Sequence, residues 1–330
     1  MGKLKIIIAE LGYPSYDPER RVLAALDAEV VLESCLTEEA LLAVCRDADA
    51  ILVRTAAPVT RGVIAALDRC KVISRYGIGV DNVDVAAATE HGIMVCNVPD
   101  YGVEEVSDQA VALLLACGRR ISSRDRAVRR GAWDIGAREP IYRIAGKALG
   151  LVGYGRIARV VHRKLTGFRF GRTVVFDPLV DEGAISAARA EKVDLPTLCS
   201  QSDFISIHAP LNDTTRHMIG AKELALMKPT TVLVNTSRGG LVDTEALVEA
   251  LRGGTIRTAG IDVYEQEPPP KDHPLFSLDN AVLSDHVSWY SEESQLELQE
   301  KAAGNVVEAL TGRTPRNLLN SEVLKKQGAT

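Results

Sequence analysis

Short apolar runs alternate with amphipathic segments along almost the whole chain, and this alternation is the feature that most constrains the fold. In the first hundred residues the apolar runs predict β-strands at 5–9, 30–32, 50–53, 72–74 and 93–96. The segments between them have the apolar spacing of helices, at 19–28, 38–46, 61–67 and 83–91. A strand–helix repeat of this kind predicts a parallel sheet with helices on both faces.

The repeat stops near residue 97, at a turn signal formed by Asn97, Pro99 and Asp100, and starts again at Lys147. Between these points we expect a long helix at 103–118 and a polar, tryptophan-containing segment at 119–143. Further strands are predicted at 148–152, 173–176, 204–207, 231–235, 259–262 and 281–284. Helices are expected to fill the gaps between them, for example at 157–166, 220–226 and 244–251, and a last long helix is expected at 292–310. A length of 330 residues suits two domains. The sequence therefore predicts an α/β protein with two doubly wound parallel sheets.

The charge and the cysteines exclude several classes of function. The formal net charge is -5, which argues against nucleic acid as a main partner, because phosphate backbones require a basic face. No apolar run reaches membrane-spanning length and no secretory leader precedes the first strand, so we expect a cytoplasmic protein with no membrane partner. The six cysteines form no CxxC pair and show no metal-like spacing. They predict reduced core thiols and no metal site.

A glycine-rich turn follows the predicted strand at 148–152 and opens the next helix. Gly153, Gly155 and Ala158 fit the pattern GxGxxA of dinucleotide-binding units. The first glycine allows the tight turn, the second lets the backbone approach a pyrophosphate, and the small third residue lets the helix pack on the sheet. The pyrophosphate would lie at the helix N-terminus, with Arg156 as an additional cation. The alternative is a plain tight turn.

An acidic residue ends the second strand of this unit, where the dinucleotide-binding pattern expects one. Asp177 follows the strand at 173–176. A carboxylate there accepts hydrogen bonds from both ribose hydroxyls and repels a 2′-phosphate, which favours NAD over NADP. The alternative is a turn residue before Pro178.

Polar residues follow three later strands of the second predicted sheet. Arg238, Glu267 and His286 lie at or just beyond strand ends, and ligands of open α/β sheets bind outside the carboxyl ends of the strands. Reduction of a 2-oxo acid needs a proton donor, a role that suits His286 with Glu267 holding its ring. Arg238 can bind a carboxylate, and Asp262 is a candidate for orienting the nicotinamide or coupling to His286. Each of these residues taken alone would more often be an ordinary loop residue.

These motifs together resemble the D-isomer-specific 2-hydroxyacid dehydrogenases, the group of D-3-phosphoglycerate dehydrogenase. The resemblance extends over nearly the whole chain. Beside the glycine turn and the His286 loop, it is based on the segments 76–84 (YGIGVDNVD), 208–217 (HAPLNDTTRH), 235–243 (NTSRGGLVD) and 262–268 (DVYEQEP). The resemblance implies that Arg238, Glu267 and His286 are the catalytic residues and that NAD is the cofactor.

The resemblance also implies the binding positions. The cofactor would contact Gly153, Tyr154, Gly155, Arg156, Ile157, Asp177, His208, Ala209, Pro210, Thr214, Thr236, Ser237, Arg238, Asp262 and His286. The substrate would contact Arg54, Arg75, Tyr76, Gly77, Ile78, Gly79, Arg238, His286 and Trp289, with backbone N–H groups of the 75–79 loop binding its carboxylate.

Family architecture implies a Rossmann NAD-binding domain at 101–288 inserted in a flavodoxin-like substrate domain made of 1–100 and 289–330. It also implies a homodimer formed through the cofactor domain, with 103–143 as the dimerisation arm. The segment 286–293 (HVSWYSEE) looks like the loop of the C-terminal binding proteins, a subgroup of NAD-binding corepressors. Trp289 would then line the substrate pocket, and core packing is its alternative role.

The sequence thus predicts an oxidoreductase that transfers a hydride between NAD(H) and a small D-2-hydroxy acid or 2-oxo acid. One alternative is an NAD(H)-responsive, corepressor-like binding protein. Another is a phosphite dehydrogenase, because enzymes of that kind keep the same Arg, Glu and His set. Formate dehydrogenases of this fold have Gln where Glu267 stands, which argues against formate. The side chain of the substrate, either a second anion or an apolar tail, stays open.

Overall fold

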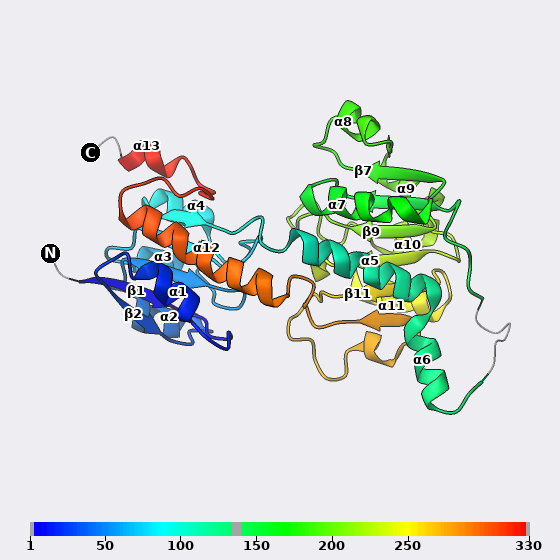
Figure 1. Ribbon diagram of the computed structural model, residues 1–330, viewed down its shortest axis with the longest axis horizontal. Helices are drawn as coiled ribbons and strands as arrows, with labels where there is room; N and C mark the ends of the chain where they lie inside the picture. Colours follow the sequence, from blue (N-terminus) through cyan, green and yellow to red (C-terminus); the bar gives the residue numbers. More distant parts are fainter. Residues whose placement is uncertain (1–2, 134–139, 328–330) are drawn as a thin grey trace. The chain divides into compact units, whose positions relative to one another are not determined.

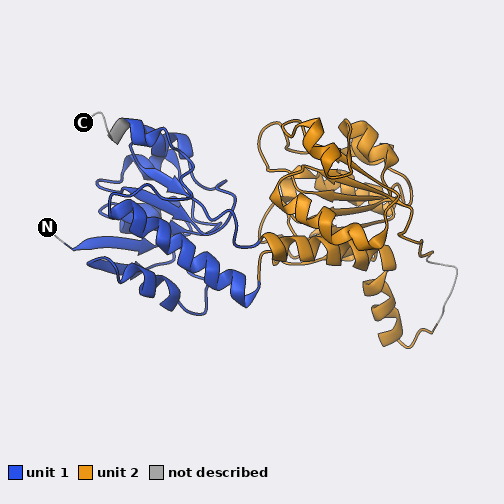
Figure 2. Cartoon of the chain, turned by 45° about the horizontal axis from the view of Figure 1, so that its top comes forward, with its two compact units in different colours: residues 1–102, 291–330 blue, residues 103–290 orange. Residues whose placement is uncertain are grey.

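The computed structural model describes residues 3–133 and 140–327. The chain divides into two compact units, one made of residues 1–102 and 291–330 and the other of residues 103–290 (Figure 2). Part of the predicted dimerisation arm, residues 134–139, lies outside the described residues.

The first unit contains a five-stranded parallel sheet with the strand order β2-β1-β3-β4-β5. Its strands are β1 (Leu4–Ile8), β2 (Ala28–Leu32), β3 (Ala50–Val53), β4 (Val72–Arg75) and β5 (Met94–Cys96). Its helices are α1 (Asp17–Leu23), α2 (Glu38–Cys45), α3 (Arg61–Ala65), α4 (Val85–Glu90), α12 (Glu292–Leu310) and α13 (Val323–Gln327) (Figure 1). Strands β2 and β3 pair with opposite sides of β1, so the strand order reverses between β1 and β3.

Side-chain caps fix where three of these helices begin. Thr37, Thr60 and Asp84 each accept a hydrogen bond from a backbone amide in the first turn of α2, α3 and α4. Helix α12 comes from the other end of the chain and packs against α1 and β4. The Ser74 hydroxyl donates to the carbonyl of Ala302 at 2.9 Å, which joins this helix to the sheet.

The second unit contains a seven-stranded parallel sheet with the order β12-β11-β10-β9-β6-β7-β8. Its strands are β6 (Ala148–Val152), β7 (Arg172–Phe176), β8 (Glu191–Lys192), β9 (Phe204–Ile207), β10 (Val232–Asn235), β11 (Thr258–Ile261) and β12 (Ala281–Leu283). Its α-helices are α5 (Val103–Arg119), α6 (Ile121–Arg129), α7 (Arg156–Leu165), α8 (Glu182–Ala187), α9 (Leu195–Gln201), α10 (Ala221–Leu226) and α11 (Thr244–Arg252). Short 3-10 helices are η1 (Thr166–Phe168), η2 (Gly239–Leu241) and η3 (Pro274–Ser277).

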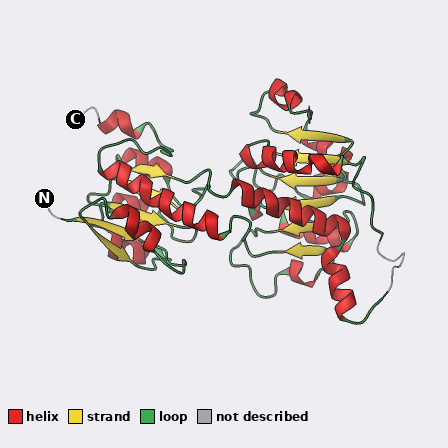
Figure 3. Ribbon diagram, viewed as in Figure 1, coloured by secondary structure: helices red, strands yellow, loops and turns green. Residues whose placement is uncertain are grey.

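Two separate apolar clusters flank this sheet. One joins Leu198, Leu224 and Leu247 of α9, α10 and α11 to the strands, and the other joins Leu114 of α5 and Val161 of α7 to them. Helices therefore cover both faces of the sheet (Figure 3). Strands β7 and β9 pair with opposite sides of β6, so the order reverses between β6 and β9, the place where open α/β sheets bind ligands.

The predicted fold class is confirmed, and the differences are local. The first predicted helix ended at residue 28, whereas α1 ends at Leu23, because Ala28 pairs with Leu4 and begins β2. Helices α8 and α9 lie in a gap between strands that was expected to be helical, but the prediction missed the two-residue edge strand β8 between them. Across the described ranges, no helix combines the length and the apolar character needed to cross a bilayer.

Candidate active site

The turn after β6 has the geometry that the glycine pattern predicts. Gly153 adopts φ +85°, and a Cβ there would lie 2.9 Å from backbone atoms of His208 and Ala209. Only glycine fits this conformation and this space. Gly155 precedes α7 without a side-chain cap, and a Cβ added to it would meet no atom within 4 Å. The first amides of α7 have no partner within the helix. The open space at Gly155, beside these amides, suits a phosphate.

Asp177 joins this turn to the end of β7. Its carboxylate accepts hydrogen bonds from the backbone amides of Tyr154 at 2.8 Å, Leu179 at 2.8 Å and Val180 at 3.0 Å. A carboxylate has about four acceptor positions, so capacity is left for a ribose hydroxyl.

The side chain of Tyr154 points away from such a ligand. It is fully buried, and its hydroxyl lies 2.8 Å from Nδ1 of His162. A cofactor contact from Tyr154 therefore has to come from its backbone. Arg156 is exposed and Ile157 is half-buried at the start of α7.

Two buried polar atoms lack partners at the ends of β9 and β10. Within the described residues, Oγ1 of Thr236 and Nδ1 of His208 form no hydrogen bond. The other ring nitrogen of His208 lies 2.9 Å from the Ser206 hydroxyl. Burial lowers the pKa of His208 to about 4, so its ring is neutral near pH 7. Buried polar groups normally have partners, and a bound nucleotide would supply them here.

The other predicted cofactor positions on these loops vary in exposure. Ala209 is buried, whereas Pro210 is exposed. The Ser237 hydroxyl donates to the carbonyl of Ile207 at 2.8 Å, and the Thr214 hydroxyl donates to Oδ1 of Asn212 at 2.7 Å. With the glycine turn and Asp177, these residues fit a dinucleotide.

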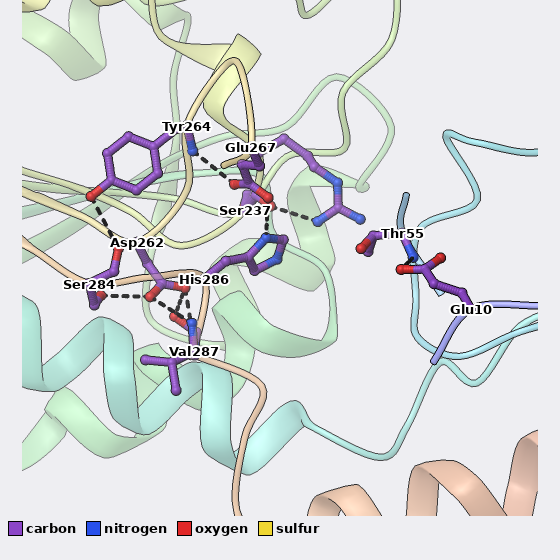
Figure 4. A network of polar contacts seen from close by, with 11 residues as sticks. Glu10, Thr55, Ser237, Asp262, Tyr264, Glu267, Ser284, His286 and Val287 are labelled. Carbon is purple, nitrogen blue, oxygen red and sulfur yellow. Dashed lines mark hydrogen bonds and ion pairs between the residues drawn. The ribbon is translucent and has the colours of Figure 1, made fainter. Parts of the chain in front are cut away.

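His286 and Glu267 form a close pair. Nδ1 of His286 lies 2.5 Å from Oε2 of Glu267, and both side chains are about one-third exposed (Figure 4). The second carboxylate oxygen accepts the Tyr264 amide at 2.9 Å. Burial raises the pKa of Glu267, but the hydrogen bond and charge of His286, the Tyr264 amide and the charge of Arg238 together lower it below its ordinary value. In the described part of the chain, Nε2 of His286 forms no hydrogen bond.

Asp262 holds the loop that presents His286. This fully buried carboxylate accepts hydrogen bonds from the Ser284 hydroxyl at 2.6 Å, the Val287 amide at 3.1 Å and both the amide and the hydroxyl of Ser288. The His286 amide donates to the Asp262 carbonyl at 2.8 Å. These bonds fix His286 in the left-handed backbone region, at φ +57°. Asp262 therefore couples β11 directly to the His286 loop (Figure 4).

Arg238 lies at the end of β10, in the loop next to that of Glu267. Its Nη1 donates to the Ser237 carbonyl at 2.8 Å, and Asn235 donates from Nδ2 to the Arg238 carbonyl at 2.9 Å. The charge of Arg238 acts on Glu267. The structure thus brings together the three residues of the predicted catalytic set.

The predicted carboxylate-binding loop lies in the first unit, after β4. The carbonyl of Gly77 accepts the Val98 amide at 2.9 Å, and that of Ile78 accepts the Asn97 side chain at 2.7 Å. The amides of Gly77, Ile78 and Gly79 donate to no group in the described ranges. Gly77 has φ +129°, a conformation that favours glycine. A fixed loop with three available N–H groups is suited to an anion.

The aromatic and basic residues around this loop have their own contacts. Arg75 is buried and donates to the Tyr76 carbonyl at 2.7 Å, while the Tyr76 hydroxyl donates to Glu19 at 2.9 Å. The guanidinium of Arg54 lies 4.8 Å from the ring centroid of Tyr13.

A buried carboxylate also fixes the turn at Arg54. Glu10 accepts hydrogen bonds from four consecutive amides at 54–57, including that of Thr55 at 3.3 Å (Figure 4). Sequence reasoning missed this role of Glu10, because nothing in its spacing points to residues more than forty positions away.

Comparison with known proteins identifies the family. Residues 111–288 match the model of the D-isomer specific 2-hydroxyacid dehydrogenase, NAD binding domain. The chain belongs to this family. It is 41% identical over 284 residues to a glyoxylate reductase of Korarchaeum cryptofilum, covering 85% of each chain. A crystal structure of a glyoxylate reductase from Paecilomyes thermophila matches with a TM-score of 0.86 and 30% identity, covering 96% of this chain and 98% of that one.

The chain is also 40% identical over 324 residues to D-3-phosphoglycerate dehydrogenase of Methanocaldococcus jannaschii. That match covers 96% of this chain but only 59% of the relative's length. Family membership makes this protein an NAD-dependent oxidoreductase of 2-hydroxy acids and confirms the predicted cofactor. The resemblance to the C-terminal binding protein subgroup stays a prediction.

Two further features of the family's cofactor unit complete the site. The ring of Trp289 packs edge-on against Tyr290, with centroids 5.6 Å apart. This contact does not test the pocket role of Trp289, which stays a prediction. Ser284 and Ser288, two positions either side of His286, were missed as supports of the loop, because their bonds reach Asp262, more than twenty positions away in the sequence. Among the described residues, no group of three or more His, Cys, Asp or Glu side chains is arranged to hold a metal ion.

The bonding of Asp262 predicts the behaviour of Asp262→Asn. The amide nitrogen of Asn would face a buried donor of the His286 loop and leave it without an acceptor. We expect a loss of about 1–3 kcal/mol in the free energy of unfolding, measured by denaturant titration, together with a lower kcat. Asp272→Asn, at an exposed side chain of the same unit, is the matched control and should change neither quantity. Equal stability of the two variants would contradict the role of Asp262.

Proposed function

We propose that this protein catalyses the reversible reduction of a small 2-oxo acid to a D-2-hydroxy acid, with His286 as the proton donor. The observation that supports this role best is the 2.5 Å contact between Nδ1 of His286 and Glu267, which leaves Nε2 available. When bound, NADH supplies the hydride that the carbonyl carbon of the substrate receives. Nε2 of His286 gives its proton to the carbonyl oxygen, and in the reverse direction it takes the proton of the hydroxyl.

Glu267 and Arg238 complete the proposed chemistry. The charged carboxylate of Glu267 holds Nδ1 of His286 and orients the ring. Arg238 has five N–H donors in a rigid fork, one of which bonds to the Ser237 carbonyl. This planar fork matches the geometry of the carboxylate and the carbonyl oxygen of a 2-oxo acid. In the first unit, the amides of Gly77, Ile78 and Gly79 are the proposed donors to the carboxylate of the substrate.

The relatives indicate which substrates to test first. Several are named glyoxylate reductase, and one, from Thermotoga maritima, is named hydroxypyruvate reductase. We therefore propose a short 2-oxo acid of this kind. Arg54, which is only partly buried, is the proposed partner of a second anionic group on the substrate.

Replacement of His286 tests the proposal. His286→Ala should lower kcat for 2-oxo acid reduction by about 10²–10⁴-fold, the usual contribution of a general acid, with NADH binding retained. The measurement is NADH oxidation with glyoxylate, hydroxypyruvate and pyruvate, and NADH fluorescence titration gives the binding. Turnover by the variant at the wild-type rate would refute the role of His286. If the wild-type protein reduced NAD⁺ with phosphite but turned over no 2-oxo acid, the phosphite dehydrogenase alternative would be supported instead. If it bound a protein partner in the presence of NADH and turned over no substrate, the corepressor-like alternative would be supported.

Asp177 is the proposed determinant of NAD preference. Asp177→Asn keeps an acceptor oxygen for the amides of Leu179 and Val180 but removes the charge that repels a 2′-phosphate. We expect the ratio of kcat/KM for NADH over NADPH to fall by about 10-fold or more, a change equal to about 1.4 kcal/mol. Asp181→Asn, at the N-cap of α8, is the control. An unchanged ratio would show that another group sets the preference.

We further propose a homodimer formed through the arm at 103–143. Helix α6 extends from the second unit (Figure 1) and has no buried residue of its own. Ile121, Val128 and Trp133 on this arm are 57%, 52% and 85% exposed. Apolar surface of this kind is typical of a protein–protein interface.

We also propose a cytoplasmic location. The six cysteines are free and buried, which suits a reducing compartment.

The arm predicts the effect of charge on assembly. Val128→Glu should convert the dimer to a monomer, because it would bury a charge in the interface. Light scattering at micromolar concentration measures the mass. Leu179→Glu places the same charge on a residue that is 93% exposed outside the arm and should leave the mass unchanged. A wild-type mass equal to that of a single chain would disprove the dimer.

A further inference from the structure

A second histidine–carboxylate pair lies beside the proposed catalytic set. Nε2 of His217 is 2.7 Å from Oε2 of Glu265, with the two side chains 41% and 32% exposed. Glu265 precedes Glu267 by two positions in the same loop. The proposed reaction uses neither His217 nor Glu265.

Glu265 is bonded to the start of a helix as well. Its second oxygen, Oε1, accepts the Thr244 amide at 3.0 Å, at the first residue of α11. Burial raises the pKa of Glu265, but its hydrogen bonds to Thr244 and His217 lower the pKa below the ordinary value. The carboxylate is therefore charged near pH 7 and joins its own loop to α11 and to His217.

His217 belongs to a segment that runs beside the turn following Arg238. The His217 amide donates to the Gly240 carbonyl at 2.7 Å, and the Ile219 amide donates to the Leu241 carbonyl at 3.1 Å. His217 adopts φ +52°, the left-handed region that is uncommon for residues other than glycine. The backbone bonds hold His217 in this conformation, from which its ring reaches Glu265.

The turn after Arg238 also touches the loop of Glu265 directly. A Cβ placed on Gly239 would lie 1.9 Å from the carbonyl carbon of Tyr264 and 2.3 Å from the amide nitrogen of Glu265. Any side chain at this position would push the two segments apart. The Tyr264 amide, one residue before Glu265, is the donor that holds Glu267.

We propose that His217 and Glu265 form a positioning pair that fixes the loop of Glu267 against the turn that follows Arg238. The pair joins three segments, which contain His217, Gly239 and Glu265, and keeps Glu267 at hydrogen-bonding distance from His286. This inference rests on the catalytic roles proposed above. A shift of a catalytic group by about 1 Å can cost 10²-fold in rate, so a loop held from both sides matters for turnover.

Kinetics of His217→Ala and His217→Gln test the pair. His217→Ala should lower kcat by about 10- to 100-fold with KM for the 2-oxo acid nearly unchanged. His217→Gln keeps an N–H donor for Glu265 and should recover most of the rate. Glu191→Gln removes a 2.7 Å ion pair with Arg172 elsewhere in the same unit and should have no effect. A His217→Ala variant as active as Glu191→Gln, or a His217→Gln variant no better than His217→Ala, would overturn the inference.

Proton NMR without cofactor or substrate separates this inference from the proposed function. A short N–H···O hydrogen bond shifts its proton far downfield, and Glu267→Gln identifies the signal of the His286–Glu267 pair. In His217→Ala this signal should shift or disappear, and in His217→Gln and Glu191→Gln it should persist. Its loss in His217→Ala supports the positioning role even if no 2-oxo acid is turned over. Its persistence unchanged in His217→Ala overturns that role.

Discussion

Strands β9 to β12 are paired in one register, and this register decides which side chains lie together at the same edge of the sheet. Ile207 of β9, Asn235 of β10, Ile261 of β11 and Leu283 of β12 occupy one row of the parallel ladder. The next residues along the chain are therefore also in line. They are His208, Thr236, Asp262 and Ser284. Polar side chains begin where the buried strands end, so the catalytic loops start from a common, rigid edge. A slip of one residue in any strand would turn its polar group to another face.

Buried and half-buried carboxylates hold the loops that leave the strand ends of both sheets. Asp262 bonds to four donors of the His286 loop, Asp177 to three backbone amides and Glu10 to four. Hydrogen bonds to charged groups contribute about 1.5–3 kcal/mol each. An exposed ion pair such as Arg61–Glu90 typically contributes about 0–1 kcal/mol. Loop geometry here therefore depends on main-chain N–H groups bonded to charge, more than on surface ion pairs.

The sequence was sufficient for the elements whose signal is local. Apolar runs located β6 and β9 at their observed bounds, and the glycine pattern predicted the tight turn in which Gly153 adopts φ +85°. It was insufficient where distant segments decide the outcome. The end of α1 depends on the pairing of Ala28 with β1, and the edge strand β8 is too short to show a period.

The candidate site divides in the same way. Arg238, Glu267 and His286 were predicted because each follows a strand, whereas the pairing of His217 with Glu265 joins residues 48 positions apart. A contact of this kind has no periodic signal in one sequence, because the two residue types are common on exposed loops. The neutral ring of His208 could not be predicted either, since it depends on burial.

The first unit is assembled from the two ends of the chain, and this has a consequence for its synthesis. Helix α12 covers β4, and Gln299 on this helix bonds to the buried carboxylate of Glu19 in α1. While the ribosome is still translating the middle of the chain, the N-terminal sheet lacks this helix, and Glu19 lacks its amide partner. The inserted unit, which is contiguous in sequence, can fold during that interval. The nascent N-terminal segment must therefore stay soluble, with one face of β4 uncovered, until α12 emerges.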